Sequence, residues 1–274
     1  MQTPCGMEVD ETLYGNIRMT DVIPTDGRTL GRCICIITGA SKGFGRALAH
    51  QVCCWLKPGS VLLLVARSET LLQELKEELK GFAVEQQLLV NCIVADLSTQ
   101  KGVNEAVRVA RLESEKENDH VLLINNAASL GDISQFSSFT DLDVVNSYMS
   151  LNISSALVLT AGMLQVFPRR PGLRWTVVNL SSVFATEALP SWVLYCTAKA
   201  ARKMMFSVLA VGEPNVRVLS YSPGPLDTGM QKDILRMTGV DNHPFPCKDS
   251  AVKLMKLLLD DDFASGTHID FFSV

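Results

Sequence analysis

Short apolar runs alternate with longer amphipathic stretches along most of this chain. The runs cover residues 33–37, 61–66, 88–94, 121–124, 175–180 and 216–221, and a last short one lies near residues 268–272. Val, Ile and Leu dominate these runs, and they lack the polar alternation of a half-exposed strand. The pattern therefore predicts parallel strands that are buried on both faces.

The intervening stretches have helical periodicity. Within residues 69–80, for example, Leu71, Leu72, Leu75 and Leu79 fall on one side of a helix. Similar stretches cover residues 101–116, 142–167, 191–211 and 249–259. Regular alternation of strand and helix predicts an α/β fold, namely a single-domain, Rossmann-like, doubly wound parallel sheet with helices on both faces.

No internal repeat and no Pro/Gly/Ser-rich linker divides the chain. Residues 1–30 lie outside the alternating pattern and are predicted to form a flexible N-terminal extension, while residues 31–274 form the domain. Residues 227–248 interrupt the pattern, and the run His243-Pro244-Phe245-Pro246 favours a loop or flap there.

Composition narrows the class of protein. The chain has 274 residues, of which 47% are hydrophobic and 20% charged, and its net charge is −4, which disfavours nucleic acid as a partner. No signal sequence and no apolar run long enough to cross a bilayer is visible, so we expect a cytoplasmic protein that does not enter the membrane. The eight cysteines form no CxxC pair and do not group with histidines, which predicts free thiols and no metal site.

A glycine-rich turn follows the first predicted strand and opens the first predicted helix. It contains Gly39, Ala40, Ser41, Lys42, Gly43, Phe44 and Gly45. Glycines at this place permit a tight turn and let the backbone approach a pyrophosphate, which the amides at the helix N-terminus then bind. The turn predicts a dinucleotide site.

The end of the second strand indicates which nicotinamide cofactor is used. Enzymes that use NAD place an acid there to bind the ribose hydroxyls, whereas this chain has Arg67 followed by Ser68. Arg67 and Lys42 suit a 2′-phosphate, which favours NADPH/NADP+. Further candidates for cofactor binding follow the next two predicted strands. Asp96 and Leu97 follow the third strand, and Asn125 follows the fourth.

A second group of residues has the chemistry of carbonyl reduction. Tyr195 and Lys199 lie four residues apart in a predicted helix and therefore share one face. Tyrosine can protonate the oxygen of a reduced carbonyl, and an adjacent ammonium is expected to lower the tyrosine pKa. Ser182 follows the fifth strand and can stabilise the developing oxyanion, and Asn152 is expected to hold a water that connects Lys199 to solvent.

From about residue 31 to the end, the chain resembles the short-chain dehydrogenases/reductases in the glycine turn, in Asn125-Asn126-Ala127 and in the set Asn152, Ser182, Tyr195 and Lys199. The segments at 123–132, 192–196, 214–218, 223–228 and 265–271 resemble those members that reduce side-chain ketones of pterins with NADPH, in the last steps of tetrahydrobiopterin synthesis.

That resemblance implies further roles. Asp270 would bind the amino-pyrimidinone edge of the pterin, since a carboxylate accepts two N–H donors at once. Val183 and Gly224 would border the substrate. The residues that would close over the nicotinamide are Leu226, Asp227, Thr228, Gly229, Met230 and Gln231. The helices at 142–167 and 191–211 would form a homodimer.

Two other functions remain open. A broader reductase of dicarbonyls, quinones or steroids would share the catalytic residues, so that Asp270 and its pocket decide between substrates. A catalytically silent NADPH-binding regulatory protein would typically have lost Tyr195 or Lys199, and both are present. The chain also departs from the family pattern, because Gly229 replaces an expected acid and the segment up to Lys248 is short.

Overall fold

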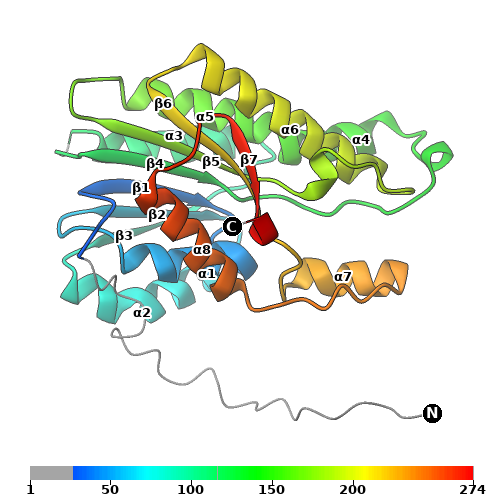
Figure 1. Cartoon of the computed structure of the whole chain (residues 1–274), viewed down its shortest axis with the longest axis horizontal. Coiled ribbons are helices and arrows are strands. Elements are labelled where there is room, and N and C mark those ends of the chain that lie inside the picture. The colour runs from blue at the N-terminus through cyan, green and yellow to red at the C-terminus, as the bar shows by residue number, and fades with distance from the viewer. Residues whose placement is uncertain (1–26, 116, 274) are drawn as a thin grey trace, which may run out of the picture.

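A seven-stranded sheet forms the centre of the computed structural model, which describes residues 27–115 and 117–273 (Figure 1). All paired strands are parallel, in the order β3-β2-β1-β4-β5-β6-β7. Their bounds are β1 Cys33–Thr38, β2 Val61–Ala66, β3 Leu89–Val94, β4 His120–Asn125, β5 Arg174–Leu180, β6 Val216–Ser222 and β7 Thr267–Asp270. The predicted doubly wound fold is confirmed.

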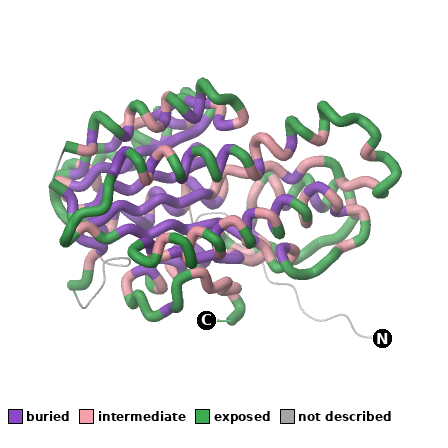
Figure 2. The backbone as a smooth tube through the Cα atoms, turned by 90° about the horizontal axis from the view of Figure 1, so that it is seen from above, coloured by how far each residue is buried: buried purple, intermediate pink, exposed green. Residues whose placement is uncertain are grey.

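Helices cover both faces of the sheet and enclose two apolar cores. One face is covered by α1 (Gly43–Cys53), α2 (Glu69–Glu85) and α8 (Cys247–Asp260), whose buried leucines join alternate residues of β1 and β2. The other face is covered by α3 (Gln100–Glu113), α5 (Ser155–Val166) and α6 (Val193–Gly212). The buried strands lie between the exposed outer surfaces of these layers (Figure 2).

The edge strand β3 differs from its prediction. Residues 88–94 were expected to be buried on both faces, yet Leu89 and Val94 are 41% and 46% exposed. A strand at the edge of the sheet has a neighbour on one side only, and the helices cover it incompletely, so an apolar run alone did not reveal its position.

The predicted helix at 142–167 is interrupted. It consists of α4 (Leu142–Met149), a π-helical turn at Ser150–Ser154, and α5. Together Leu142–Val166 is long and apolar enough to cross a membrane by length and composition, with a mean hydropathy of 1.4. In the fold, however, Leu159 and Met163 of α5 pack in the core against the sheet, so α5 belongs to the layer that covers this face.

The segment at 227–248, which was predicted to be a loop or flap, contains a helix, α7 (Gly229–Thr238), that the sequence analysis did not predict. Thr228 caps its first turn by accepting a hydrogen bond from Gln231 N, and Gly239 ends it in the left-handed conformation with φ 72°. An N-cap threonine and a glycine after the last turn are the usual ends of a helix, and both were visible in the sequence.

The predicted N-terminal extension lies mostly outside the described residues, which begin at Gly27. At the end of that segment, Leu30 is 1% exposed and belongs to the core under α1 and α8. Its N–H donates to Trp55 O at 2.8 Å, and its carbonyl accepts from Arg174 at 2.7 Å. Leu30 thus packs as part of the domain.

Candidate active site

Tyr195, Lys199 and Ser182 meet where β5 and β6 end, at the carboxyl edge of the sheet. Lys199 lies one turn after Tyr195 on α6, with Nζ 5.5 Å from the centre of the tyrosine ring. Ser182 lies just beyond the end of β5 at Leu180 and caps the turn Val183–Ala185 by accepting from Phe184 N. Ligands of doubly wound proteins bind at this edge.

The pKa of Tyr195 moves in the direction opposite to our expectation. Burial raises it, because a phenolate loses more hydration than a phenol, while a hydrogen bond with Ser182 lowers it. Among charged groups it is Arg202 rather than Lys199 that lowers the pKa of Tyr195. The predicted lowering by Lys199 is therefore wrong for this structure.

Lys199 is itself affected by burial. Its ammonium donates to Leu180 O at 2.8 Å, at the end of β5. Burial lowers the pKa of Lys199 to about 7, and the nearby positive charge of Arg202 lowers it further in the same direction. Near neutral pH the lysine is thus only partly charged.

Arg202 is the residue that sequence reasoning missed. It is 1% exposed, and its guanidinium donates to Asn179 Oδ1 at 2.8 Å, to Asn125 O at 2.6 Å and to Ala127 O at 3.2 Å. It lies seven residues after Tyr195, on the same helical face. That spacing was the available signal, but an arginine on a helix is usually exposed.

Asn152 lies in the π-helical turn between α4 and α5. Its amide donates to Tyr148 O at 2.9 Å and to Ser129 Oγ at 3.0 Å, and its oxygen accepts from Ser129 N at 2.8 Å. Asn152 thereby fixes the loop after β4. Its predicted role in holding a water for Lys199 stays a prediction.

The glycine turn is packed so closely that a side chain at Gly39 or Gly45 would collide with neighbouring atoms. A Cβ on Gly45 would lie 2.3 Å from Gly39 O, and Gly39 itself has φ +65°. Asn126 secures the turn by donating from its amide to Thr38 O at 2.8 Å and Gly39 O at 3.2 Å. By contrast Asn125, the residue we singled out, points its amide to Thr160 Oγ1 at 3.0 Å.

The residues at this turn fit a dinucleotide. The first turn of α1 contains no acid, and the side chain of its N-cap residue Lys42 makes no capping hydrogen bond, so the amides there are suited to a phosphate. Arg67 is exposed at the end of β2, and Ser68 caps α2 by accepting from Leu71 N at 3.4 Å.

The next polar candidate, Asp96, is partly committed within its own loop. Its Oδ1 accepts from Ser98 N at 3.0 Å and from Ser98 Oγ at 2.8 Å. These hydrogen bonds lower the pKa of Asp96, and the charge of Arg67 acts in the same direction. Asp96 is therefore an anionic acceptor, and the neighbouring Leu97 is buried in the core beneath α3.

The segment at 226–231 contacts both the glycine turn, where the cofactor is expected, and the cluster around Tyr195. A Cβ on Gly43 would lie 3.2 Å from Cγ2 of Thr228, so the start of α7 reaches the glycine turn. Met230 packs in a cluster with Trp192 and Tyr195. Gln231 is buried, and its Nε2 has no hydrogen-bond partner among the described residues, as expected of a donor that meets a ligand.

The other members of the segment connect it to the rest of the fold. Leu226 is buried in the core and forms a β-bridge with Phe245, and Asp227 N donates to Phe245 O at 2.9 Å. Gly229 opens α7, and a Cβ added there would meet no other atom within 4 Å.

The predicted substrate residues come from three elements. Asp270 ends β7 and is half-buried, and its Oδ1 accepts from Phe272 N at 2.9 Å. Gly224 follows β6 with φ +80°, beside the rings of Phe245 and Phe272. Val183 is 39% exposed next to Ser182. Asp270 and Gly224 are thus neighbours, at the ends of adjacent strands.

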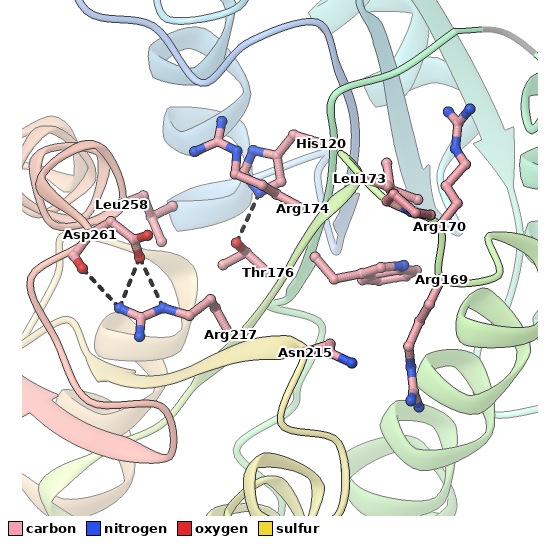
Figure 3. Close-up of a pocket in the computed structure, with 12 residues that line it drawn as sticks. His120, Arg169, Arg170, Leu173, Arg174, Thr176, Asn215, Arg217, Leu258 and Asp261 are labelled. Carbon is pink, nitrogen blue, oxygen red and sulfur yellow. Dashed lines mark hydrogen bonds and ion pairs between the residues drawn. The ribbon is translucent and has the colours of Figure 1, made fainter.

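A cavity of about 510 Å³ lies elsewhere, at the amino ends of β4, β5 and β6 (Figure 3). Its arginines hold loop carbonyls and acids: Arg217 binds Asp261 Oδ1 at 3.0 Å, and Arg170 donates to Asn118 O at 3.1 Å. None of the predicted site residues lines it. Over the described ranges, no group of His, Cys, Asp or Glu side chains is arranged to hold a metal ion.

Comparison with known proteins agrees with this geometry. Residues 33–239 match the family model described as short chain dehydrogenase. The chain is 47% identical to sepiapterin reductase of Rattus norvegicus over 264 residues, covering 91% of this chain and all of the relative. It is also 47% identical to sepiapterin reductase of Xenopus laevis, covering 89% of this chain and 97% of the relative.

Solved structures agree as well. A short chain dehydrogenase from Salmonella enterica serovar Typhi superposes with a TM-score of 0.72 at 26% identity, covering 88% of this chain and 96% of that one. The chain therefore belongs to the short chain dehydrogenase family of oxidoreductases, and within that family its full-length relatives include the sepiapterin reductases.

Proposed function

We propose that this protein reduces the side-chain ketone of a pterin with NADPH, as a sepiapterin reductase. The observation that carries the proposal is the placement of two groups at one edge of the sheet. Tyr195, Lys199 and Ser182 form a carbonyl-reducing group, and Asp270 lies two strands away from β5, on β7. Identity of 47% over nearly the whole chain supports the same substrate class.

Tyr195, Ser182 and Lys199 have separate roles in the proposed reaction. Bound NADPH supplies the hydride. The hydroxyl of Tyr195 gives its proton to the carbonyl oxygen as negative charge develops there. Ser182 hydrogen-bonds the same oxygen as negative charge develops there. Lys199, with a pKa of about 7, exchanges protons readily near neutral pH and returns one to Tyr195.

Two basic residues favour NADPH over NADH. Arg67 stands where an acid would bind the ribose of NAD, and Lys42 lies at the N-terminus of α1. A 2′-phosphate placed between them forms charge-assisted hydrogen bonds that NADH does not offer.

The test is to mix the purified protein with sepiapterin and follow the loss of reduced-cofactor absorbance, with NADPH and NADH in parallel. Turnover that is much faster with NADPH supports the substrate and the cofactor together. Activity on a small diketone without activity on sepiapterin would instead establish the broader carbonyl reductase. Binding of NADPH with no turnover of either substrate would indicate a silent regulatory protein.

We further propose that the protein is a homodimer of cytoplasmic subunits. Met204, Val208 and Val211 are 66%, 62% and 86% exposed along one side of α6, and Leu157 is 53% exposed on α5. Apolar side chains that follow a helix face favour a partner. Light scattering should give the mass of two subunits, and Val208→Glu should give one. The seven described cysteines are free, as in a reducing compartment.

A further inference from the structure

The segment that connects α7 to α8 places Phe245 between the segment at 225–227 and the turn that follows Asp270. Its backbone forms a β-bridge across Leu226, since Phe245 N donates to Pro225 O at 3.1 Å and Phe245 O accepts from Asp227 N at 2.9 Å. Pro225 and Asp227 lie just before Thr228, which contacts the glycine turn at Gly43. Phe245 is thus tied by its backbone to the cofactor side.

The side chain of Phe245 contacts the substrate side. Its ring stacks on Phe271 with centroids 4.5 Å apart and meets the edge of Phe272 at 6.1 Å. Phe271 is also held by Lys253, whose Nζ donates to its carbonyl at 2.7 Å and lies 4.2 Å from its ring centre. The turn Phe271–Ser273 is therefore packed between α8 and Phe245.

That turn orients Asp270. The carboxylate accepts from Phe272 N at 2.9 Å, so the direction of Asp270 depends on where the turn lies. No lysine or arginine of residues 27–115 and 117–273 forms an ion pair with Asp270, which leaves its charge available to a ligand. Any displacement of the turn would move the carboxylate with it.

Gly224 makes room for this contact. A Cβ at that position would lie 2.8 Å from Cζ of Phe245 and 3.5 Å from Cε2 of Phe272. The ends of β6 and β7 and the segment after α7 thus meet at one point, and the Phe245 ring fills the space between them. Phe245 also packs on the core beneath α8, which gives it a fixed support.

We propose that Phe245 is a positioning residue for substrate choice, because it sets the place of Asp270 relative to the segment at 225–227. The inference rests on the proposed function, in which Asp270 binds the pterin ring. Loss of the Phe245 ring frees the turn at 271–273, so a substrate that needs Asp270 is bound less well. A small diketone is held only at Tyr195 and Ser182 and is reduced as before.

The experiment compares Phe245→Ala with the wild type on sepiapterin and on 2,3-butanedione, and measures KM and kcat for each. We expect KM for sepiapterin to rise about tenfold or more, and kcat/KM for the diketone to stay within about twofold. The Kd for NADPH should change little, which also shows that the variant is folded. Phe245→Leu, which keeps bulk without stacking, gives an intermediate rise and serves if Phe245→Ala does not fold.

A matched control and a double substitution distinguish positioning from general packing. Phe82→Ala removes a partly buried ring from the same core on α2, far along the sheet, and should leave the ratio of the two substrates unchanged. In an Asp270→Ala background, Phe245→Ala should have no further effect on sepiapterin, because Phe245 acts through that carboxylate.

Equal losses on both substrates, or fully additive effects of the two substitutions, would overturn the inference. So would an unchanged KM for sepiapterin in Phe245→Ala. If the wild type does not reduce sepiapterin at all, the proposed function fails and the inference falls with it. Turnover of sepiapterin that is indifferent to Phe245 refutes the inference alone.

Discussion

Replacement of Arg202 by methionine tests how the catalytic edge is held together. Methionine has a similar length but no donors, so three acceptors lose their partner: Asn179 Oδ1, Asn125 O and Ala127 O, at 2.8, 2.6 and 3.2 Å. The first two are fully buried, and a buried acceptor without a partner costs about 1–3 kcal/mol. The third bond is longer and partly exposed, and it contributes less.

The cost of burying the charge of Arg202 partly offsets the stability that its hydrogen bonds contribute. Burial lowers the pKa of Arg202 to about 10, which shows that the guanidinium loses hydration in the fold, and methionine avoids that cost. After this offset we expect the free energy of unfolding to fall by about 3 kcal/mol. For a domain of this size such a loss lowers Tm by roughly 6–12 °C.

Urea and thermal unfolding of Arg202→Met and wild type measure this loss directly. Arg111→Met, on the exposed last turn of α3, is the control and should change stability by less than about 0.5 kcal/mol. A loss below about 1 kcal/mol for Arg202→Met, with an unchanged m-value, would refute the reasoning. The variant should also show a pH–rate profile shifted upward, since the charge of Arg202 lowers the pKa values of Tyr195 and Lys199.

Three further substitutions test the chemistry. Tyr195→Phe keeps the ring that packs 5.5 Å from Trp192 but removes the proton donor, so kcat should fall about 10²- to 10⁴-fold with Tm unchanged; undiminished turnover would disprove the role of Tyr195. Arg67→Asp should raise KM for NADPH about tenfold or more while sparing NADH, and a parallel rise for both would contradict the phosphate assignment. Burial lowers the pKa of Lys199 from 10.5 to about 7, so the unfolded chain binds the proton more tightly than the folded protein. The free energy of unfolding of the wild type should therefore decrease as pH falls from about 10.5 to about 7, by up to about 1.4 kcal/mol per pH unit, whereas that of Lys199→Met should not. An equal dependence of the unfolding free energy on pH in the two proteins would rule this out.

Much of the architecture follows from local patterns in the chain. Apolar runs and helical stretches repeat with regular spacing, and parallel strands joined by helices have few topologies available. For the same reason the glycine turn and the Tyr195–Lys199 pair were visible, because each depends on residues a few positions apart. Their place at one edge of the sheet follows from the direction of parallel strands.

Features that depend on neighbours far along the chain were not visible. The exposure of β3 depends on its edge position, and the π-helical turn contains Asn152, whose side chain bonds the distant loop after β4. The tyrosine pKa was predicted in the wrong direction because burial, which raises it, is a property of the folded environment.

For this protein the sequence by itself determined the order of strands and helices, the dinucleotide turn and the chemistry of the catalytic helix. Only the tertiary structure decided that the side chain of Arg202, on the same helix, is buried. It also decided that Phe245 lies between the segment at 225–227 and the turn after Asp270. The physical reason is distance along the chain. Periodicity and turn chemistry act between near neighbours, whereas burial, desolvation and aromatic packing arise from segments that only the fold brings together.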